Sequence, residues 1–357
     1  MAVASTDLTT SAVAAALRGK KADVSGSLFR GALLATLTLT VVILITLLVS
    51  VVQDAWPVLT SEPLREEVRA DLVDTTTDPP TVTQFGETFA VDVDVDAGGN
   101  ATYYTIEDRS LGTFLTSKVD YTNPAQNGIF QAIVGSIGIA VLVLLIAIPL
   151  GVGAAVYLEE YASQSTFTRF VDVNIRNLAG VPSIVYGILG YSVLAVALSG
   201  LTGGRSLLTG GITMAILVLP VVIITSAEAL RAVPQPIREA GYGVGCTRWE
   251  VTRHHVVPYA LPGILTGTML SLARALGEAA PLILVGAQTG LFTDGAFEQL
   301  RGKFTALPMT VYNLTRQPGE ALKTDGTAAT IVVLLMIVLA VNAAGILLRN
   351  SFEKKRS

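Results

Sequence analysis

Long apolar runs with almost no charge constrain the fold of this chain more than any other feature of its sequence. A helix needs about 20 apolar residues to cross the roughly 30 Å hydrocarbon layer of a membrane. Six stretches reach that length, namely residues 28–52, 129–157, 178–198, 206–225, 262–287 and 328–348. Only 15% of the 357 residues are charged, well below the roughly 25% of a soluble domain. The sequence therefore predicts an all-α polytopic membrane protein with six transmembrane helices.

Lysine and arginine residues gather in three groups, and their placement predicts the orientation. The groups precede the first run, separate the fourth from the fifth, and follow the sixth: Arg18, Lys20, Lys21 and Arg30; Arg231, Arg238, Arg248 and Arg253; Arg349, Lys354, Lys355 and Arg356. Six spans place all three groups on one side, and short segments rich in Lys and Arg stay in the cytoplasm. We expect a multi-pass protein of the cell membrane, with the tails 1–27 and 351–357 both cytoplasmic.

The segment 53–127 would then lie outside, and it is strongly acidic. Within it, residues 88–95 alternate apolar and polar side chains, and the turn sequence Ala97-Gly-Gly-Asn100 separates them from the β-prone residues 101–106. This pattern indicates a β-hairpin. Because a lone hairpin is marginal in water, we expect it to pair with further strands or to pack on the membrane part. The sequence predicts a small β-containing extracytoplasmic insert before a helical core at 128–350.

A polar loop, residues 228–262, lies between the fourth and fifth runs and carries a spaced motif. Its members are Glu239, Ala240, Gly241, Gly245 and Pro258. The spacing resembles the EAA loop of the permease subunits of ABC importers, although Gly241, His255 and Val257 depart from the side chains of the strict pattern. In that family the loop docks on the ATPase subunit. The alternative is a surface amphipathic loop whose spacing arose by chance.

The chemistry of such a loop is mechanical. Small side chains let two backbones approach closely, so we expect Ala240 and Gly241 to supply the contact with a partner. Gly245 would allow a sharp backbone turn between two short helices. The arginines at 238, 248 and 253 would form a basic rim that pairs with acidic groups on the partner.

Two opposite charges stand inside the fifth run. Arg274 comes twelve residues after Pro262, roughly 18 Å along a helix, and Glu278 follows at i+4, where an ion pair can form. Charges at this depth cost about 2.5–3.5 kcal/mol and normally face a bundle interior or a polar path. We expect an anion path with Arg274 as its fixed positive group; the alternative is a buried pair that locks helices together. Pro281 would break or kink the helix just past the pair.

The sequence around this pair, residues 273–282, resembles the matching segment of phosphate-importer permeases. Residues 177–187 resemble the entry of the third helix of those permeases, and residues 128–135 and 148–160 resemble the second helix and its exit, most closely in the PstA type. The similarity covers about residues 125–350. The resemblance implies a type I ABC importer permease fold and a transporter subunit rather than an enzyme. It also implies two ATPase subunits, a homologous second permease and an extracytoplasmic phosphate-binding protein as partners. No P-loop motif stands in the sequence, so we expect no bound cofactor and place ATP use in the ATPase partner.

A hypothesis on selectivity follows. Hydrogen phosphate carries a proton that the carboxylate of Glu278 could accept in a hydrogen bond while Arg274 holds the charge, whereas sulfate carries none. Alternatives stay open. The chain could be a permease for another oxyanion, such as molybdate or sulfate, or a membrane sensor or scaffold whose insert is a receptor. An intramembrane enzyme ranks last, because the runs hold no metal motif, paired Asp or Ser–Lys arrangement.

Overall fold

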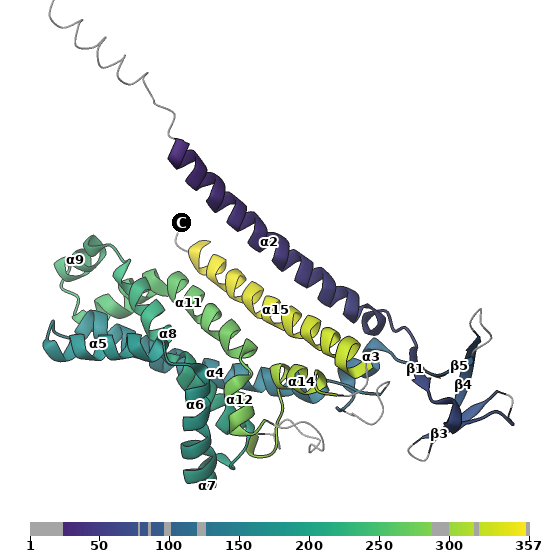
Figure 1. The fold of residues 1–357 in the computed structure, drawn as a ribbon. Coiled ribbons are helices and arrows are strands. Elements are labelled where there is room, and N and C mark those ends of the chain that lie inside the picture. Colours follow the sequence, from purple (N-terminus) through teal and green to yellow (C-terminus); the bar gives the residue numbers. More distant parts are fainter. Residues whose placement is uncertain are drawn as a thin grey trace, which may run out of the picture. The chain divides into compact units, whose positions relative to one another are not determined.

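The computed structural model describes residues 24–77, 79–84, 87–95, 101–119, 126–287, 300–317 and 321–354. The chain divides into two units, residues 1–53 and 54–357. The first contributes most of one helix, and the second holds a helical bundle and a small sheet (Figure 1).

Helix α2 (Val24–Leu59) contains the first predicted span and extends past it at both ends. No charged residue stands between Arg30 and Asp54. The threonine hydroxyls within it are satisfied by the helix itself, since those of Thr36 and Thr38 donate to the carbonyl four residues earlier at 2.9 and 2.8 Å. Such back-bonding lets a hydroxyl sit in an apolar helix without a further partner, so α2 can cross a membrane.

Four long helices form the bundle of the second unit: α4 (Phe130–Val156), α8 (Leu207–Arg231), α11 (Val257–Gly277) and α15 (Thr327–Lys354). They carry the second, fourth, fifth and sixth predicted spans. Glycines bring α4 against α8, because a Cβ added at Gly138 would come within 2.7 Å of Leu207, and one at Gly151 within 2.6 Å of Val222. Small residues give close helix packing in membranes, where van der Waals contact replaces the hydrophobic effect.

The predicted third span, residues 178–198, is confirmed only in part, because its helix begins at Ser183 after a sharp bend. The chain instead forms α5 (Thr166–Ala179), then α6 (Ser183–Leu189) and the π-helical segment η3 (Gly190–Ala197), with a bend of 101° between the two parts. The cause is Pro182, which has no N–H to donate and disfavours helical geometry at the residue before it. The short helix α7 (Ser199–Thr202) then leads into α8.

The fifth span also differs from the prediction of one helix over 262–287. Helix α11 begins five residues before Pro262 and ends at Gly277, and a separate short helix, α12 (Ala280–Val285), follows. Glu278 adopts an extended conformation, with φ −87° and ψ 116°. The predicted break just past the Arg274–Glu278 pair is thus confirmed, and Pro281 takes a place in the first turn of α12 that needs no N–H.

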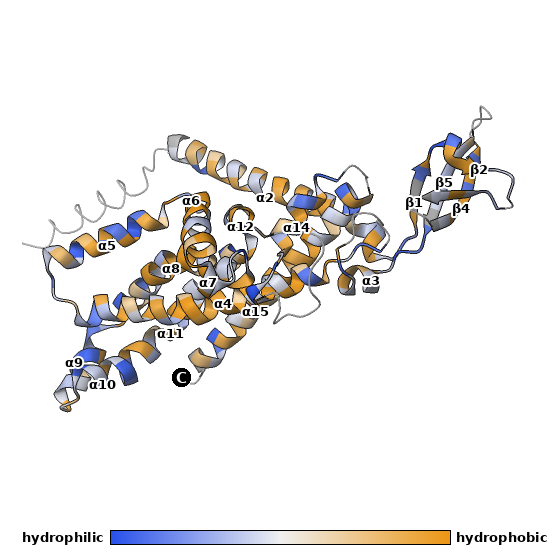
Figure 2. Cartoon of the chain, turned by 90° about the horizontal axis from the view of Figure 1, so that it is seen from below, coloured by the Kyte–Doolittle hydropathy of each residue, from blue (hydrophilic) through white to orange (hydrophobic). Residues whose placement is uncertain are grey.

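Among the described residues, five helices are long and apolar enough to span a membrane, or up to six if the bent pair α5–η3 counts as one span. The chain is therefore a helical membrane protein, while the count of six stays a prediction. Figure 2 shows the contrast between the largely apolar long helices and the hydrophilic α9 (Gln235–Gly243) and α10 (Arg248–Val251).

A five-stranded antiparallel sheet lies between α2 and α4 in the sequence. Its order is β1-β5-β4-β3-β2, and the strands are β1 (Leu64–Val68), β2 (Val73–Asp74), β3 (Thr81–Gln84), β4 (Glu87–Val95) and β5 (Ala101–Glu107). The predicted hairpin is confirmed as β4–β5, with further strands on both sides; its turn, 96–100, lies outside the described residues. The core of the sheet is small and centres on Val68, Val82 and Val91.

The sheet is tied to the bundle by the short helix α3 (Leu111–Thr116) and by one ion pair. Arg109, which is 5% exposed, pairs with Asp325 in the π-helical segment η5 (Ala321–Gly326) at 3.2 Å. The backbone N–H of Leu111 also donates to the Ser61 hydroxyl at 3.0 Å. Helix α14 (Leu307–Leu314) completes this end of the bundle.

Candidate functional site

The loop between α8 and α11 folds into α9, α10 and the π-helical segment η4 (Thr252–Val256). Gly245 has a φ of 85° and joins α9 to α10, which confirms the predicted turn between two short helices. A capping box starts α10: the N–H of Thr247 donates to the Glu250 carboxylate at 2.7 Å, and the N–H of Glu250 donates to the Thr247 hydroxyl at 3.4 Å. This arrangement satisfies backbone donors that a helix start leaves unpaired, so the loop has a defined shape.

The motif residues of α9 do not all face the same way. Glu239 and Ala240 are exposed, whereas Gly241 is buried. A Cβ at Gly241 would come within 2.8 Å of Val251 of α10. The expectation that Gly241 offers a close contact to a partner is therefore wrong, because its small size lets α9 pack on the loop's own second helix. Pro258 is exposed in the first turn of α11.

Arg238 is not part of an outward basic rim. It pairs with Glu160 at 2.7 Å, and the exposed fractions of the two side chains are 14% and 5%. Its guanidinium also donates to the backbone carbonyls of Leu230 and Val233 at 2.9 and 2.8 Å. The prediction that Arg238 pairs with a partner protein is corrected, since its donors are used within the chain.

The other two arginines of the predicted rim stack on aromatic rings. Arg248 lies over the ring of Tyr161 at 5.3 Å, and Arg253 lies over the ring of Trp249 at 5.9 Å. Such stacking leaves the edge of a guanidinium able to donate hydrogen bonds. These two residues therefore keep the capacity to contact a partner that Arg238 has lost.

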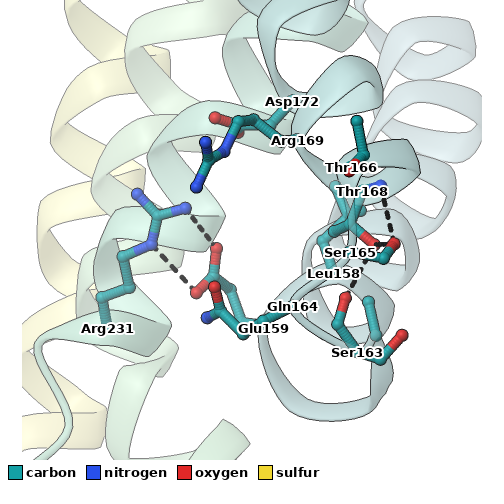
Figure 3. Close-up of a pocket in the computed structure, with 11 residues that line it drawn as sticks. Leu158, Glu159, Ser163, Gln164, Ser165, Thr166, Thr168, Arg169, Asp172 and Arg231 are labelled. Atoms are coloured by element: carbon teal, nitrogen blue, oxygen red, sulfur yellow. Dashed lines mark hydrogen bonds and ion pairs between the residues drawn. The ribbon is translucent and has the colours of Figure 1, made fainter.

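A polar pocket of about 480 Å³ opens at the corner where α4 passes into α5 (Figure 3). The side chain of Arg231, at the end of α8, reaches into this corner and pairs with Glu159 through two hydrogen bonds of 2.9 and 2.6 Å. Most of the remaining wall comes from polar residues of the turn and of α5, with Leu158 and Ala162 beside them: Ser163, Gln164, Ser165, Thr166, Thr168, Arg169 and Asp172. None of the residues predicted to line a substrate path or to touch the ATPase lies in this pocket.

The two charges of the fifth predicted span form the expected pair, at the point where α11 ends. Arg274 occupies the last turn of α11, and Glu278 is the first residue after it; Nε and Oε1 are 3.6 Å apart. The exposed fractions of the side chains are 41% and 27%. The pair is therefore only partly buried within the single chain, and both the anion path and the helix-locking pair stay predictions. Helix α6 packs beside the break, where a Cβ at Gly187 would come within 2.7 Å of the Pro281 Cα.

Sequence reasoning missed the residues at the end of α4. Glu159, Glu160 and Tyr161 lie in a π-helical turn, η2 (Tyr157–Tyr161), that continues α4. Two adjacent carboxylates at the end of an apolar run, with four arginines in the loop 228–262, were the available signal. Nothing in the sequence said which arginine each carboxylate takes.

Comparison with known families decides what kind of protein carries this geometry. The family model described as "binding-protein-dependent transport system inner membrane component" matches residues 147–357. The chain belongs to this family. The match includes the α9–α10 loop and the Arg274–Glu278 pair, and it confirms the expected class, a membrane permease subunit of an ABC importer.

Individual relatives agree with this membership. The "Phosphate transport system permease protein PstA 1" of Mycobacterium tuberculosis is 34% identical over 232 residues, which are 64% of this chain and 73% of the relative. The "Phosphate transport system permease protein PstC" of Mesorhizobium japonicum is 32% identical over 253 residues, or 65% of this chain and 76% of the relative. The resemblance to PstA-type permeases is thus confirmed. Among solved structures, a chain of the MetNI methionine ABC transporter in an inward-facing conformation matches with a TM-score of 0.47 at 15% identity, covering 63% of this chain and 94% of that one.

Proposed function

We propose that this chain is a PstA-type permease subunit of an ABC importer for inorganic phosphate, with Arg274 and Glu278 on the substrate path. One observation supports this most directly: Arg274 stands in the membrane part yet is 41% exposed in the single chain. Because a charge facing lipid is costly, such a residue normally faces a water-filled path or a neighbouring chain. The path accordingly runs along this face, which a second, homologous permease covers.

Two interrupted helices meet beside the pair. Helix α11 stops at Gly277, and the α5–α6 break falls between Ala179 and Ser183. Transporters commonly place substrate sites at discontinuous helices near the middle of the membrane. The contact between Gly187 and Pro281 brings α6 against α12 at this point, which supports the same location for the anion path.

The chemistry of the pair suits a protonated oxyanion. A guanidinium offers a planar fork of donors that matches phosphate oxygens. Arg274 and Glu278 are 3.6 Å apart, beyond ordinary hydrogen-bond distance. An anion could therefore take the donors of Arg274 while its own proton is donated to Glu278. Sulfate has no proton to donate at neutral pH, so the carboxylate of Glu278 would repel it.

Coupling would pass through the α9–α10 loop. The exposed Glu239 and Ala240 of α9 form the surface that docks on the ATPase subunit, Gly245 fixes the turn, and Pro258 starts α11 at the edge of that surface. ATP is hydrolysed in the partner subunit, and an extracytoplasmic phosphate-binding protein delivers the anion. This assignment places the loop and both termini in the cytoplasm and the sheet outside.

The test is phosphate uptake by vesicles that carry the assembled complex, with Arg274→Ala and Arg274→Lys compared with the unmodified chain. A hydrogen bond to a charged group contributes about 1.5–3 kcal/mol, so Arg274→Ala should lower uptake about tenfold or more. Arg274→Lys keeps the charge but loses the planar set of donors, so its uptake should lie between that of Arg274→Ala and that of the unmodified chain. Uptake by Arg274→Ala equal to that of the unmodified chain would remove Arg274 from the path.

A further inference from the structure

Three consecutive residues at the end of α4 each meet a different arginine. Within the turn η2, Glu159 pairs with Arg231 of α8 at 2.6 Å, and Glu160 pairs with Arg238 of α9 at 2.7 Å. Tyr161 lies under Arg248 of α10, with 5.3 Å from the guanidinium carbon to the ring centre. The end of α4 is thereby connected to the end of α8 and to both helices of the loop; Figure 1 labels α4, α8 and α9.

The central contact is the most strongly held of the three. Arg238 donates to Glu160 and also to the carbonyls of Leu230, in the last turn of α8, and of Val233, two residues past the end of that helix. One guanidinium therefore joins α9, the end of α8 and the end of α4. The Glu160 side chain is 5% exposed, whereas Arg231 of the neighbouring pair is 48% exposed.

Burial makes this link stiff. Removing one partner of a buried ion pair leaves an uncompensated charge in a place of low polarity, which is strongly unfavourable. Arg238 and Glu160 must therefore move together when α9 moves. The exposed residues Glu239 and Ala240 follow Arg238 directly in α9, so a force applied to them acts one residue from the link.

The backbone that receives this force is a π-helical turn. Such turns interrupt the regular α-helical hydrogen bonding and occur frequently at functional sites. In this chain the turn η2 connects α4, which packs along α8, to the corner where α5 begins. A displacement of Glu160 would consequently be passed to α4 and α8 together.

We propose that Arg238 and Glu160 are the positioning pair through which movement of α9 reaches the membrane helices α4 and α8. The pair does not touch the ATPase; it converts displacement of the docking helix into displacement of the bundle. The proposal rests on the proposed function, since an ATPase partner must move α9.

The experiment uses the assembled complex in vesicles and measures ATP hydrolysis and phosphate uptake in the same preparation. The variants are Glu160→Gln, which keeps the shape and removes the charge, and Arg238→Lys, which keeps the charge and loses the fork that spans three acceptors. Asp71→Asn is the control, because it breaks the exposed Arg69–Asp71 pair, whose side chains are 80% and 60% exposed and which lies outside the contacts at the end of α4.

We expect both pair variants to retain the ATPase subunit on purification and to hydrolyse ATP, while the ATP consumed per phosphate imported rises about tenfold in Glu160→Gln and less in Arg238→Lys. Asp71→Asn should leave the ratio unchanged. An unchanged ratio in both pair variants, or loss of the ATPase subunit from both, would overturn the proposal and leave the pair a purely structural or assembly contact. If the unmodified complex hydrolyses ATP without importing phosphate, the substrate assignment fails instead.

Discussion

At the residue scale, Arg238 and Arg274 have the same side chain but differ in burial and in the number of their partners. Arg238 is 14% exposed and donates to a carboxylate and two carbonyls. Arg274 is 41% exposed and has Glu278 as an ion-pair partner at 3.6 Å. A saturated guanidinium serves as a structural link, whereas a loosely paired one keeps donors for a ligand. The two residues therefore need separate tests.

Glu278→Gln tests the selectivity hypothesis at this scale. The amide keeps the shape of the side chain but accepts the phosphate proton more weakly than a carboxylate, so phosphate uptake should fall about tenfold. Inhibition of the remaining uptake by sulfate should become stronger, because the carboxylate that repels a dianion is gone. Both quantities are measured by uptake of labelled phosphate with and without sulfate.

The control for that variant is Glu62→Gln, which removes an exposed carboxylate at the start of the insert. It should change neither the rate nor the response to sulfate. If Glu278→Gln transports phosphate as well as this control does, the carboxylate has no part in substrate recognition.

At the element scale, the sequence was sufficient to predict some helices and strands, but not where every helix begins and ends. Apolar length predicted α2, α4, α8 and α15, because a membrane requires it, and strand alternation with a turn signal predicted β4 and β5. Pro281 predicted a break near the end of the fifth span, but not that α11 stops at Gly277, since tertiary contacts decide where a helix ends.

The partners of the loop arginines could not be predicted from the sequence either. Spacing placed Glu239, Gly245 and Pro258 in one loop, but the direction of each side chain depends on how α9 packs. Gly241 and Arg238 face inward because Val251 and Glu160 lie there, and Glu160 is 78 residues away from Arg238 in the sequence. A pattern in one sequence carries no information on such a pair.

The ion pair between Arg109 and Asp325 gives a prediction about the elements it joins. Asp325→Asn leaves the guanidinium of Arg109, 5% exposed, without its partner charge. A loss of this kind costs up to about 3–5 kcal/mol when the pair is fully buried, and less here because Asp325 is 25% exposed. We expect a clearly lower midpoint of thermal unfolding for the purified complex in detergent.

Asp71→Asn is the reference for that measurement. It removes the Arg69–Asp71 pair, whose side chains are 80% and 60% exposed, and exposed pairs contribute about 0–1 kcal/mol. Equal midpoints for the two variants would show that the Arg109 contact does not hold the sheet to the bundle.

At the scale of the whole molecule, the orientation can be tested with the chain's own cysteine. Cys246 is the one cysteine in the sequence and is partly exposed in the α9–α10 loop. The proposed orientation places it inside, so a maleimide that cannot cross membranes should label inside-out vesicles and leave right-side-out vesicles unlabelled. The reverse result would put the loop outside, where no ATPase could reach it.

A second variant tests whether the maleimide reaches a thiol on the opposite side of the membrane. Cys246→Ser combined with Thr77→Cys moves the thiol to an exposed position near the sheet, and the labelling should then be confined to right-side-out vesicles. Labelling of both cysteine positions from the same side would contradict the proposed path of the chain through the membrane.

The central claim, that this permease subunit serves a phosphate importer, is tested most directly by ATP-dependent uptake of labelled phosphate. The vesicles would carry the chain with its co-purifying ATPase subunits, second permease and phosphate-binding protein, and excess sulfate or molybdate would be added as competitors. The account predicts uptake that requires ATP and is unaffected by either competitor. ATP-dependent uptake of sulfate or molybdate in place of phosphate, or no flux of any of the three anions, would contradict it.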